Sequence, residues 1–239
     1  MWPTSIAFVA AVMTSQESLR PDGAHWSFTV PAGWQLADEA ALRRVNDEVA
    51  ARGVGIAYVG ALVCTDAQGP FVLLQVAGPL PPGRRAEAIR RDMGKGFESG
   101  VATAKEKLAN DVTGMTNTKP EFDESRVQLR TRAEIRNADG STLGLLSVTH
   151  LGKAETVVVH CYAPAPVFDE WQPRFEAVNA AMVFDAGYRY ELATPSPVAP
   201  SVAGGLGAGL WRGAIIGGVM AVAAGAIVWY RRSRMSPGS

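Results

Sequence analysis

The sequence predicts an α+β fold: an antiparallel sheet of about six strands packed with two or three helices, plus one C-terminal transmembrane helix. Three observations support this fold class. Short segments of alternating polar and apolar residues are joined by tight turns, which favours antiparallel pairing. Between them lie segments whose apolar residues recur at helical spacing. Near the C-terminus, a charge-free apolar run is long enough to cross a bilayer.

The first half of the folded domain, expected over residues 25–192, opens with HWSFTVPAGWQL. Its large apolar residues alternate with Ser and Thr, which predicts a half-buried strand that Pro31 ends. Asp38 is a suitable N-cap for a helix through DEAALRRVNDEVAARG, and Gly53 is a suitable stop. Two strands follow in GIAYVGALVCTD and PFVLLQVAG, with turn residues between them.

In the second half, a longer helix is expected from near Arg85. It contains three glycines, each costing up to about 1 kcal/mol, so either tertiary packing stabilises the helix or the helix is interrupted. RVQLRTRAEIR alternates apolar and charged residues and predicts a strand with one face in the core. The turns NADGS and LGKAE then give an antiparallel meander of three strands, and a last helix is expected over residues 170–183.

The opening FTVPAGW, the two antiparallel blocks and the closing FEAVNAAMVFD resemble the PsbP/DcrB-like superfamily over about residues 25–186. Members of that superfamily are small α/β/α sandwich domains, often exported and lipid- or membrane-associated in bacteria. Here the domain would be fused to a C-terminal membrane anchor. The resemblance carries no catalytic motif over to this chain and implies a binding or assembly role.

The C-terminal region predicts a tether. Residues 193–210 are rich in Pro, Gly and Ala and are expected to form a linker. Residues 211–230 are the predicted transmembrane helix, because the run from Trp211 to Trp229 would span ~27 Å as a helix. Residues 231–239 form a basic tail. The predicted membrane-interface residues are Trp211, Trp229, Tyr230, Arg231, Arg232 and Arg234.

Two further features of the tether concern its partners and its orientation. Gly213 and Gly217 have the GxxxG spacing that lets two helices approach closely in lipid, so a homodimer through this helix is one expectation. The arginines after the span place the C-terminus in the cytoplasm and the domain outside, as a single-pass protein of a bacterial inner membrane. Residues 1–24 hold only a short signal-like run without a basic n-region, so a cytoplasmic domain stays an alternative.

Motifs for catalysis, metals and cofactors were not found. The chain has equal numbers of acidic and basic residues, 23 each, which gives no general attraction to nucleic acid. His25, His150 and His160 lack the spacing of a metal site, and no nucleophile elbow or P-loop occurs. Cys64 and Cys161 are expected to be buried thiols, or one disulfide in an oxidising compartment. We therefore predict no catalytic residue, metal or cofactor.

The best candidate for recognition is the arginine face of the predicted strand over residues 126–136, formed by Arg126, Arg130, Arg132 and Arg136. These guanidiniums could bind phosphates, carboxylates or an acidic partner. The alternative is a solvated face whose charge is balanced by Glu134 and helix carboxylates. The predicted function is a membrane-tethered, non-enzymatic binding or assembly domain, with the lipid bilayer and a protein as partners. A small-molecule-binding domain on an anchor and an unrecognised hydrolase are the alternatives.

Overall fold

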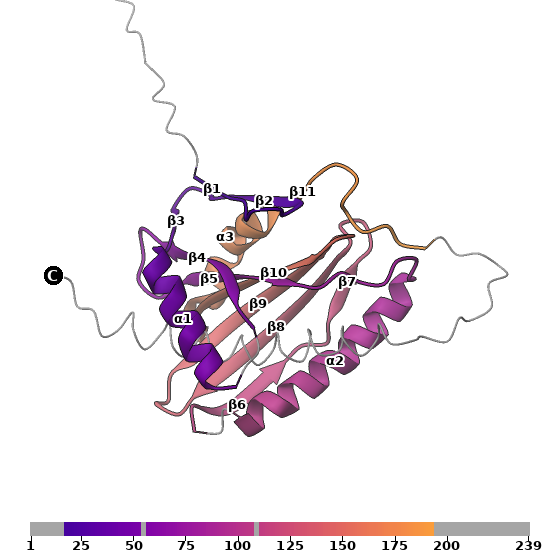
Figure 1. Ribbon diagram of the computed structural model, residues 1–239. Helices are drawn as coiled ribbons and strands as arrows, with labels where there is room; N and C mark the ends of the chain where they lie inside the picture. Colours follow the sequence, from indigo (N-terminus) through magenta and orange to yellow (C-terminus); the bar gives the residue numbers. More distant parts are fainter. Residues whose placement is uncertain (1–16, 54–55, 108–109, 194–239) are drawn as a thin grey trace, which may run out of the picture.

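The computed structural model describes residues 17–53, 56–107 and 110–193 (Figure 1). In chain order its elements are β1 (Ser18–Leu19), β2 (Trp26–Thr29), β3 (Trp34–Leu36), α1 (Glu39–Ala51), β4 (Tyr58–Cys64), β5 (Phe71–Ala77), α2 (Ala86–Lys107), β6 (Val112–Asn117), β7 (Glu121–Asp123), β8 (Gln128–Asn137), β9 (Thr142–Leu151), β10 (Thr156–Pro164), a 3-10 turn (Ala165–Val167), α3 (Phe168–Ala180) and β11 (Met182–Phe184).

The strands of the described region form two antiparallel sheets. The larger has eight strands, in the order β3-β4-β5-β10-β9-β8-β6 with β7 also paired to β8. The smaller has the order β1-β2-β11. The α+β class is therefore confirmed, but the expectation of about six strands in one sheet was wrong. Several strands are only two or three residues long, too short to show alternation in the sequence.

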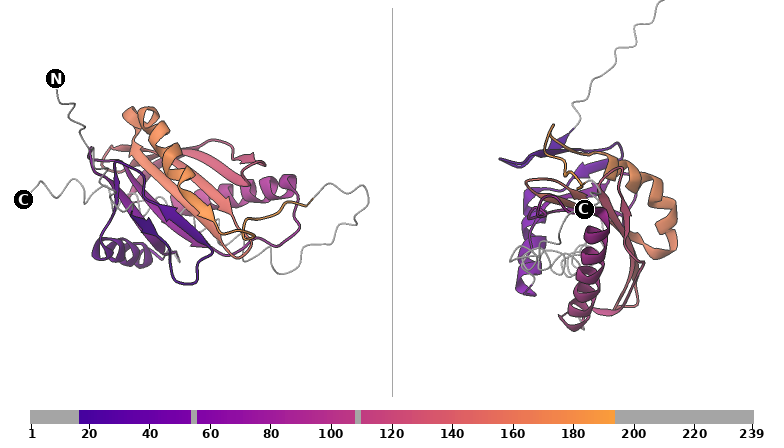
Figure 2. Two further views of the ribbon diagram at one scale, coloured as in Figure 1. Left: turned by 90° about the horizontal axis from the view of Figure 1, so that it is seen from above. Right: turned by 90° about the vertical axis from the view of Figure 1, so that its right-hand side faces the viewer.

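The larger sheet is the middle layer of the domain (Figures 1 and 2). On one face lie α1 and α2. Val45 and Val49 of α1 pack with Leu143 and Leu145 of β9, and Ile89 of α2 belongs to a second cluster at the end of the sheet. On the other face, α3 and the small sheet share one apolar cluster with the strands, which includes the fully buried Trp26, Phe28, Phe175 and Val178. The apolar clusters under α1 and under α3 thus lie on opposite faces of one sheet.

The helices follow the sequence pattern with one shifted boundary. Asp38 is the N-cap of α1, because its Oδ1 accepts a hydrogen bond from the backbone N of Ala41 at 2.6 Å. The second helix, α2, is continuous despite its glycines. The expected end of the last helix at residue 183 was wrong, because α3 ends at Ala180 and Met182 and Val183 belong to β11.

The predicted meander is confirmed as β8, β9 and β10, joined by antiparallel ladders. Both cysteines are free thiols, so the disulfide alternative was wrong in this structure. Cys161 is buried as expected, whereas Cys64 is partly exposed.

The predicted tether lies outside the described residues. Among the helices that the structure describes, none is long and apolar enough to cross a membrane. Residues 194–239, with the interface aromatics, the arginines and the Gly213–Gly217 pair, fall beyond the described part, as does the signal-like run near the N-terminus.

Candidate binding site

The structure separates the four predicted arginines of residues 126–136. Arg130 and Arg132 lie on the face of β8 that α3 covers. Arg130 forms an ion pair with Glu176, and Arg132 donates a hydrogen bond to Gln172, both residues of α3. The guanidinium of Arg132 also lies 5.8 Å from the ring centroid of Phe168. These two side chains therefore fasten α3 to the sheet.

The other two predicted arginines lie at opposite ends of the strand. Arg136 is exposed, with its Nη2 3.7 Å from Oε1 of Glu134. Arg126 precedes β8, which begins at Gln128, and its side chain is 61% exposed. Helix carboxylates and Glu134 thus lie close to three of the four arginines, and Arg126 is the one that faces a hollow in the surface.

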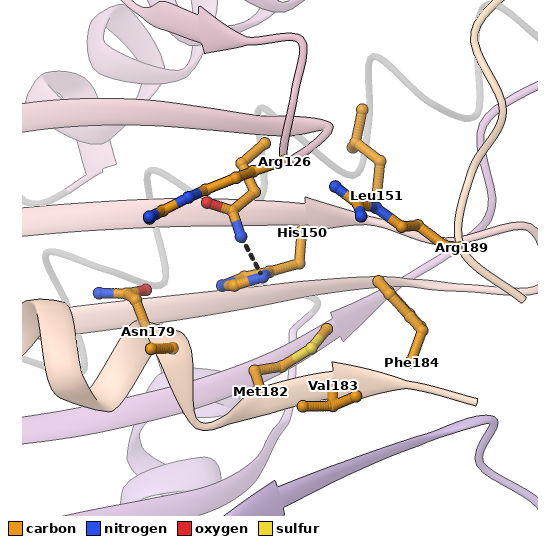
Figure 3. A pocket seen from close by; sticks show the side chains of 10 residues that line it. Arg126, His150, Leu151, Asn179, Met182, Val183, Phe184 and Arg189 are labelled. Atoms are coloured by element: carbon orange, nitrogen blue, oxygen red, sulfur yellow. Dashed lines mark hydrogen bonds between the residues drawn. The ribbon is translucent and has the colours of Figure 1, made fainter. Parts of the chain in front are cut away.

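That hollow is a cleft of about 400 Å³ between the ends of β8 and β9 on one side and the α3–β11 connection on the other (Figure 3). We call it the Arg126–Arg189 cleft. It is lined by Arg126, Gln128, His150, Leu151, Asn179, Ala180, Met182, Val183, Phe184 and Arg189. Apolar side chains form much of its wall, and polar groups converge on its floor, which is the usual composition of a small-ligand site.

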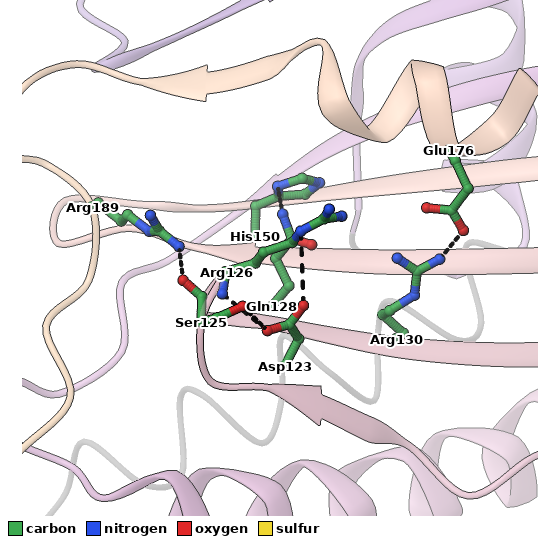
Figure 4. Close-up of polar contacts among 8 residues, drawn as sticks. All are labelled: Asp123, Ser125, Arg126, Gln128, Arg130, His150, Glu176 and Arg189. Atoms are coloured by element: carbon green, nitrogen blue, oxygen red, sulfur yellow. Dashed lines mark hydrogen bonds and ion pairs between the residues drawn. The ribbon is translucent and has the colours of Figure 1, made fainter. Parts of the chain in front are cut away.

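The cleft carries an excess of positive charge. Nη2 of Arg189 donates to the backbone O of Ser125 at 2.7 Å, and within the described residues Arg189 has no acidic partner (Figure 4). Nε of Arg126 lies 3.9 Å from Oδ2 of Asp123. That carboxylate also accepts hydrogen bonds from the Ser125 hydroxyl at 2.6 Å and from the backbone N of Arg126 at 3.0 Å. Of the two guanidiniums, only that of Arg126 lies near a carboxylate, and other donors already hydrogen-bond to that carboxylate.

His150 supplies a buried hydrogen-bond donor on the cleft floor. It is only 3% exposed, and burial lowers its pKa to about 4, an effect that the positive charges of Arg130 and Arg189 reinforce and Asn179 opposes. The imidazole is therefore neutral at pH 7. The Nε2 amide of Gln128 lies 3.0 Å from Nδ1 of His150. Because an amide nitrogen donates, Nδ1 is the acceptor, and the single ring proton sits on Nε2.

This Nε2–H group has no partner at ordinary hydrogen-bond geometry among the described residues, because its side-chain contact with Asn179, which opposes the lowering of the His150 pKa, falls outside that geometry. Asn179 of α3 is 4% exposed, and its side chain contains a buried acceptor that is also incompletely paired. Its Nδ2 donates to the backbone O of Phe175 at 2.7 Å, while its Oδ1 is buried without a partner at ordinary hydrogen-bond geometry in the described part of the chain. Leaving such a group unsatisfied costs about 1–3 kcal/mol. The donor of His150 and the acceptor of Asn179 therefore satisfy each other only in part, and both residues line the cleft.

The backbone beside the cleft is strained. Val127 has φ of 53°, the only positive φ at a non-glycine among the described residues. A β-branched side chain is unfavourable in this left-handed region, at a cost of about 1–3 kcal/mol. This dihedral turns the chain between Arg126 and Gln128. Arg126 therefore lies outside β8, whereas Gln128 is the first residue of that strand, and both residues line the cleft.

The side chains that line the cleft are of the kinds that bind a ligand. No cluster of three metal-ligating side chains occurs in the described residues. The one hydroxyl close by, that of Ser125, donates to Asp123, and the neutral His150 contacts Gln128. Guanidinium forks and a buried donor are groups that hold and orient an anion.

Sequence reasoning identified Arg126 but missed Arg189, Asn179 and the role of His150. Arg189 lies within GYRYE after the last strand, a segment without periodicity, and Asn179 lies on the buried side of a helix. Only the tertiary fold brings these residues beside Arg126. The spacing of the sequence contains no signal of that juxtaposition.

Known proteins similar to this chain are found among solved structures. No protein-family model and no curated protein match the sequence. Among solved structures, the chain is similar to the solution structure of cyanobacterial PsbP (CyanoP) from Synechocystis, with a TM-score of 0.46 and 10% sequence identity. The match covers 76% of this chain and 98% of that chain. The similarity concerns the fold alone.

Proposed function

We propose that this protein is a membrane-tethered binding protein whose α+β domain takes a small organic anion in the Arg126–Arg189 cleft. One observation carries the proposal: the guanidiniums of Arg126 and Arg189 converge on a cleft that is lined by no acidic residue of the described part of the chain and whose floor holds the buried, incompletely paired Nε2–H of His150. A solvated arginine surface would not need such a floor. Of the arginines singled out in the sequence, the proposal keeps Arg126 and adds Arg189.

The anion is a carboxylate or a phosphate ester attached to an apolar body. Planar guanidiniums bind such oxyanions in a bidentate way, and Arg126 and Arg189 approach the cleft from different segments (Figure 3). Leu151, Met182 and Phe184 contribute apolar surface that would shield the rest of the ligand from water. Nε2–H of His150 would donate to the ligand, and because this imidazole is neutral it adds no further charge.

The membrane part of the proposal is supported by the sequence. The charge-free run over residues 211–230 and the arginines after it are typical of a span with a cytoplasmic C-terminus, with the domain outside a bacterial-type inner membrane. Tethering would raise the effective concentration of the domain near membrane partners. The Gly213–Gly217 pair would permit a second copy to pack against the span.

Calorimetric titration tests the binding site. The full chain in a mild non-ionic detergent is titrated with hexanoate and phenyl phosphate, and with hexanamide as the uncharged control. Arg126→Gln combined with Arg189→Gln should weaken binding at least tenfold. The matched control, Arg43→Gln with Arg136→Gln, removes the same charge at exposed positions away from the cleft and should bind as the parent does. Equal affinities in both variants, or no binding of either anion by the parent, would refute the proposal.

A further inference from the structure

We infer that the ligand of the Arg126–Arg189 cleft is the C-terminus of an extended peptide, which adds as a strand to the free edge of β11 and places its terminal carboxylate between the two arginines. This inference rests on the proposed function and narrows it from an organic anion to a peptide carboxylate. Three observations lead to it: the edge position of β11, the direction of its backbone groups, and the match between the cleft's polar groups and a peptide end.

The small sheet ends at β11. The order β1-β2-β11 gives β11 one neighbour, and in the described part of the chain no strand pairs with its other side. Val183, in the middle of β11, is 57% exposed. An exposed strand edge presents a row of backbone donors and acceptors that another strand can pair with.

The backbone hydrogen bonds show which groups face that edge. The N–H of Asp185 donates to the O of His25 at 2.9 Å, and the O of Ala181 accepts from the N–H of Thr29 at 3.2 Å. In an antiparallel pair, alternate residues direct both backbone groups to the same neighbour. Residues 181 and 185 therefore face β2, and Met182 and Phe184 direct their N–H and C=O groups to the opposite side. Both of these residues also line the cleft.

The dimensions suit a short strand. The three residues of β11 extend ~10 Å at about 3.3 Å per residue, and a paired strand would lie ~4.8 Å from it. All three residues of β11 line the cleft of about 400 Å³, so the cleft runs along the length of this strand. A small anion could bind the arginines, but it would leave the edge of β11 unpaired. A peptide of three or four residues would bind the arginines and also pair with the edge of β11.

The cleft's polar groups match the end of such a peptide. Its terminal carboxylate would meet the guanidiniums of Arg126 and Arg189, which have one carboxylate, Asp123, between them. Side chains of an added strand point alternately toward the floor and toward solvent. The one facing the floor would meet Nε2–H of His150 and Oδ1 of Asn179. A hydroxyl or carboxamide side chain could accept from His150 and donate to Asn179 in place of their imperfect mutual contact, so we expect Ser, Thr, Asn or Gln at that peptide position.

The test begins with a peptide array. The full chain in non-ionic detergent is incubated with peptides anchored at their N-termini, randomised at the last four positions and ending in a free carboxylate. A parallel array carries C-terminal amides. We expect enrichment on the carboxylate array only, with at least tenfold weaker binding of the matched amide by fluorescence polarisation. N-methylation of the backbone amide that pairs with β11 should weaken binding to a similar extent.

A pair of variants tests the strand edge on the protein side. Phe184→Pro removes a backbone N–H that faces the cleft and takes no part in the ladder with β2. Phe184→Ala removes the same ring and keeps the N–H, so it is the matched control. Phe184→Pro should lose at least tenfold more peptide affinity than Phe184→Ala. Circular dichroism confirms that each variant is folded, and the N-methylated peptide gives the same information if Phe184→Pro is not.

The outcomes separate this inference from the function on which it rests. Equal binding of carboxylate and amide peptides, or of N-methylated and unmodified ones, would overturn the peptide inference. If hexanoate or phenyl phosphate still bound through Arg126 and Arg189, the proposed anion site would stand without it. Absence of any anion binding would overturn both.

Discussion

Acidification should destabilise the domain through its two buried histidines, and His160 provides the cleaner test because it lies outside the cleft. Its Nδ1 lies 3.1 Å from the Ser147 hydroxyl and its Nε2 lies 3.2 Å from Oε1 of Gln75, so the neutral ring is satisfied on both sides. Burial lowers the pKa of His160 from 6.5 to about 3. The unfolded chain therefore binds a proton from pH 6.5 downward, and the folded chain does not.

The difference in proton binding between the unfolded and folded chains sets the direction and size of the change in stability with pH. Because the unfolded state binds more protons between pH 6.5 and about 3, the free energy of unfolding falls as the pH falls through this window. The slope is half of about 1.4 kcal/mol per pH unit at pH 6.5 and approaches about 1.4 kcal/mol per pH unit below it, so His160 alone should cost about 2 kcal/mol between pH 6.5 and pH 4.5. His150, whose pKa burial lowers to about 4, adds a loss of similar size. The carboxylates with lowered pKa values, Asp66, Asp92 and Asp123, lose stabilisation only below about pH 3.8.

Urea unfolding of the full chain in detergent, followed by tryptophan fluorescence at pH 6.5 and pH 4.5, measures this loss. His160→Gln keeps a donor and an acceptor but does not titrate, so it should lose about 2 kcal/mol less than the parent on acidification. With a urea dependence of about 2 kcal/mol per molar, that difference moves the midpoint by about 1 M. If His160→Gln and the parent lost the same free energy, the explanation by a buried neutral imidazole would be refuted.

Three further predictions concern stability and the tether. Gly144→Ala should destabilise the domain by about 1–3 kcal/mol, because a Cβ there would lie 2.4 Å from the ring of Phe168; an unchanged melting temperature would contradict that packing. Asp38→Ala should cost about 0.5–2 kcal/mol through loss of the α1 cap, whereas Asp38→Asn should cost much less, as urea midpoints will show. The full chain should sediment with membranes after cell rupture and need detergent for release, and recovery in the aqueous fraction would exclude the tether.

Local patterns predicted the parts of the fold that short-range physics controls. The alternation in RVQLRTRAEIR gave β8 its buried residues Leu129 and Ile135, because side chains of a strand alternate between faces. Asp38 marked the start of α1 because an N-cap needs only its own helix. The meander from β8 to β10 followed from two tight turns.

The parts of the fold and of the cleft that the sequence did not predict depend on contacts between distant segments. The strand β11 is three residues long and is defined by pairing with β2, so no periodicity marks it. The arginines of β8 read as a single face, but α3 lies over Arg130 and Arg132 and uses them as internal partners. The positive φ of Val127 is set by the surrounding structure, since valine disfavours that conformation on its own.

The pairing of β2 with β11 joins the two ends of the domain and has a consequence for biosynthesis. Trp26 and Phe28 lie near the beginning of the chain, yet their strand partner is among the last parts of the domain to be made. At about 5–20 residues per second, the ribosome needs on the order of ten seconds to produce the partner. During that interval two large aromatic rings lack their final cover, so the emerging polypeptide is a natural client for a holding chaperone.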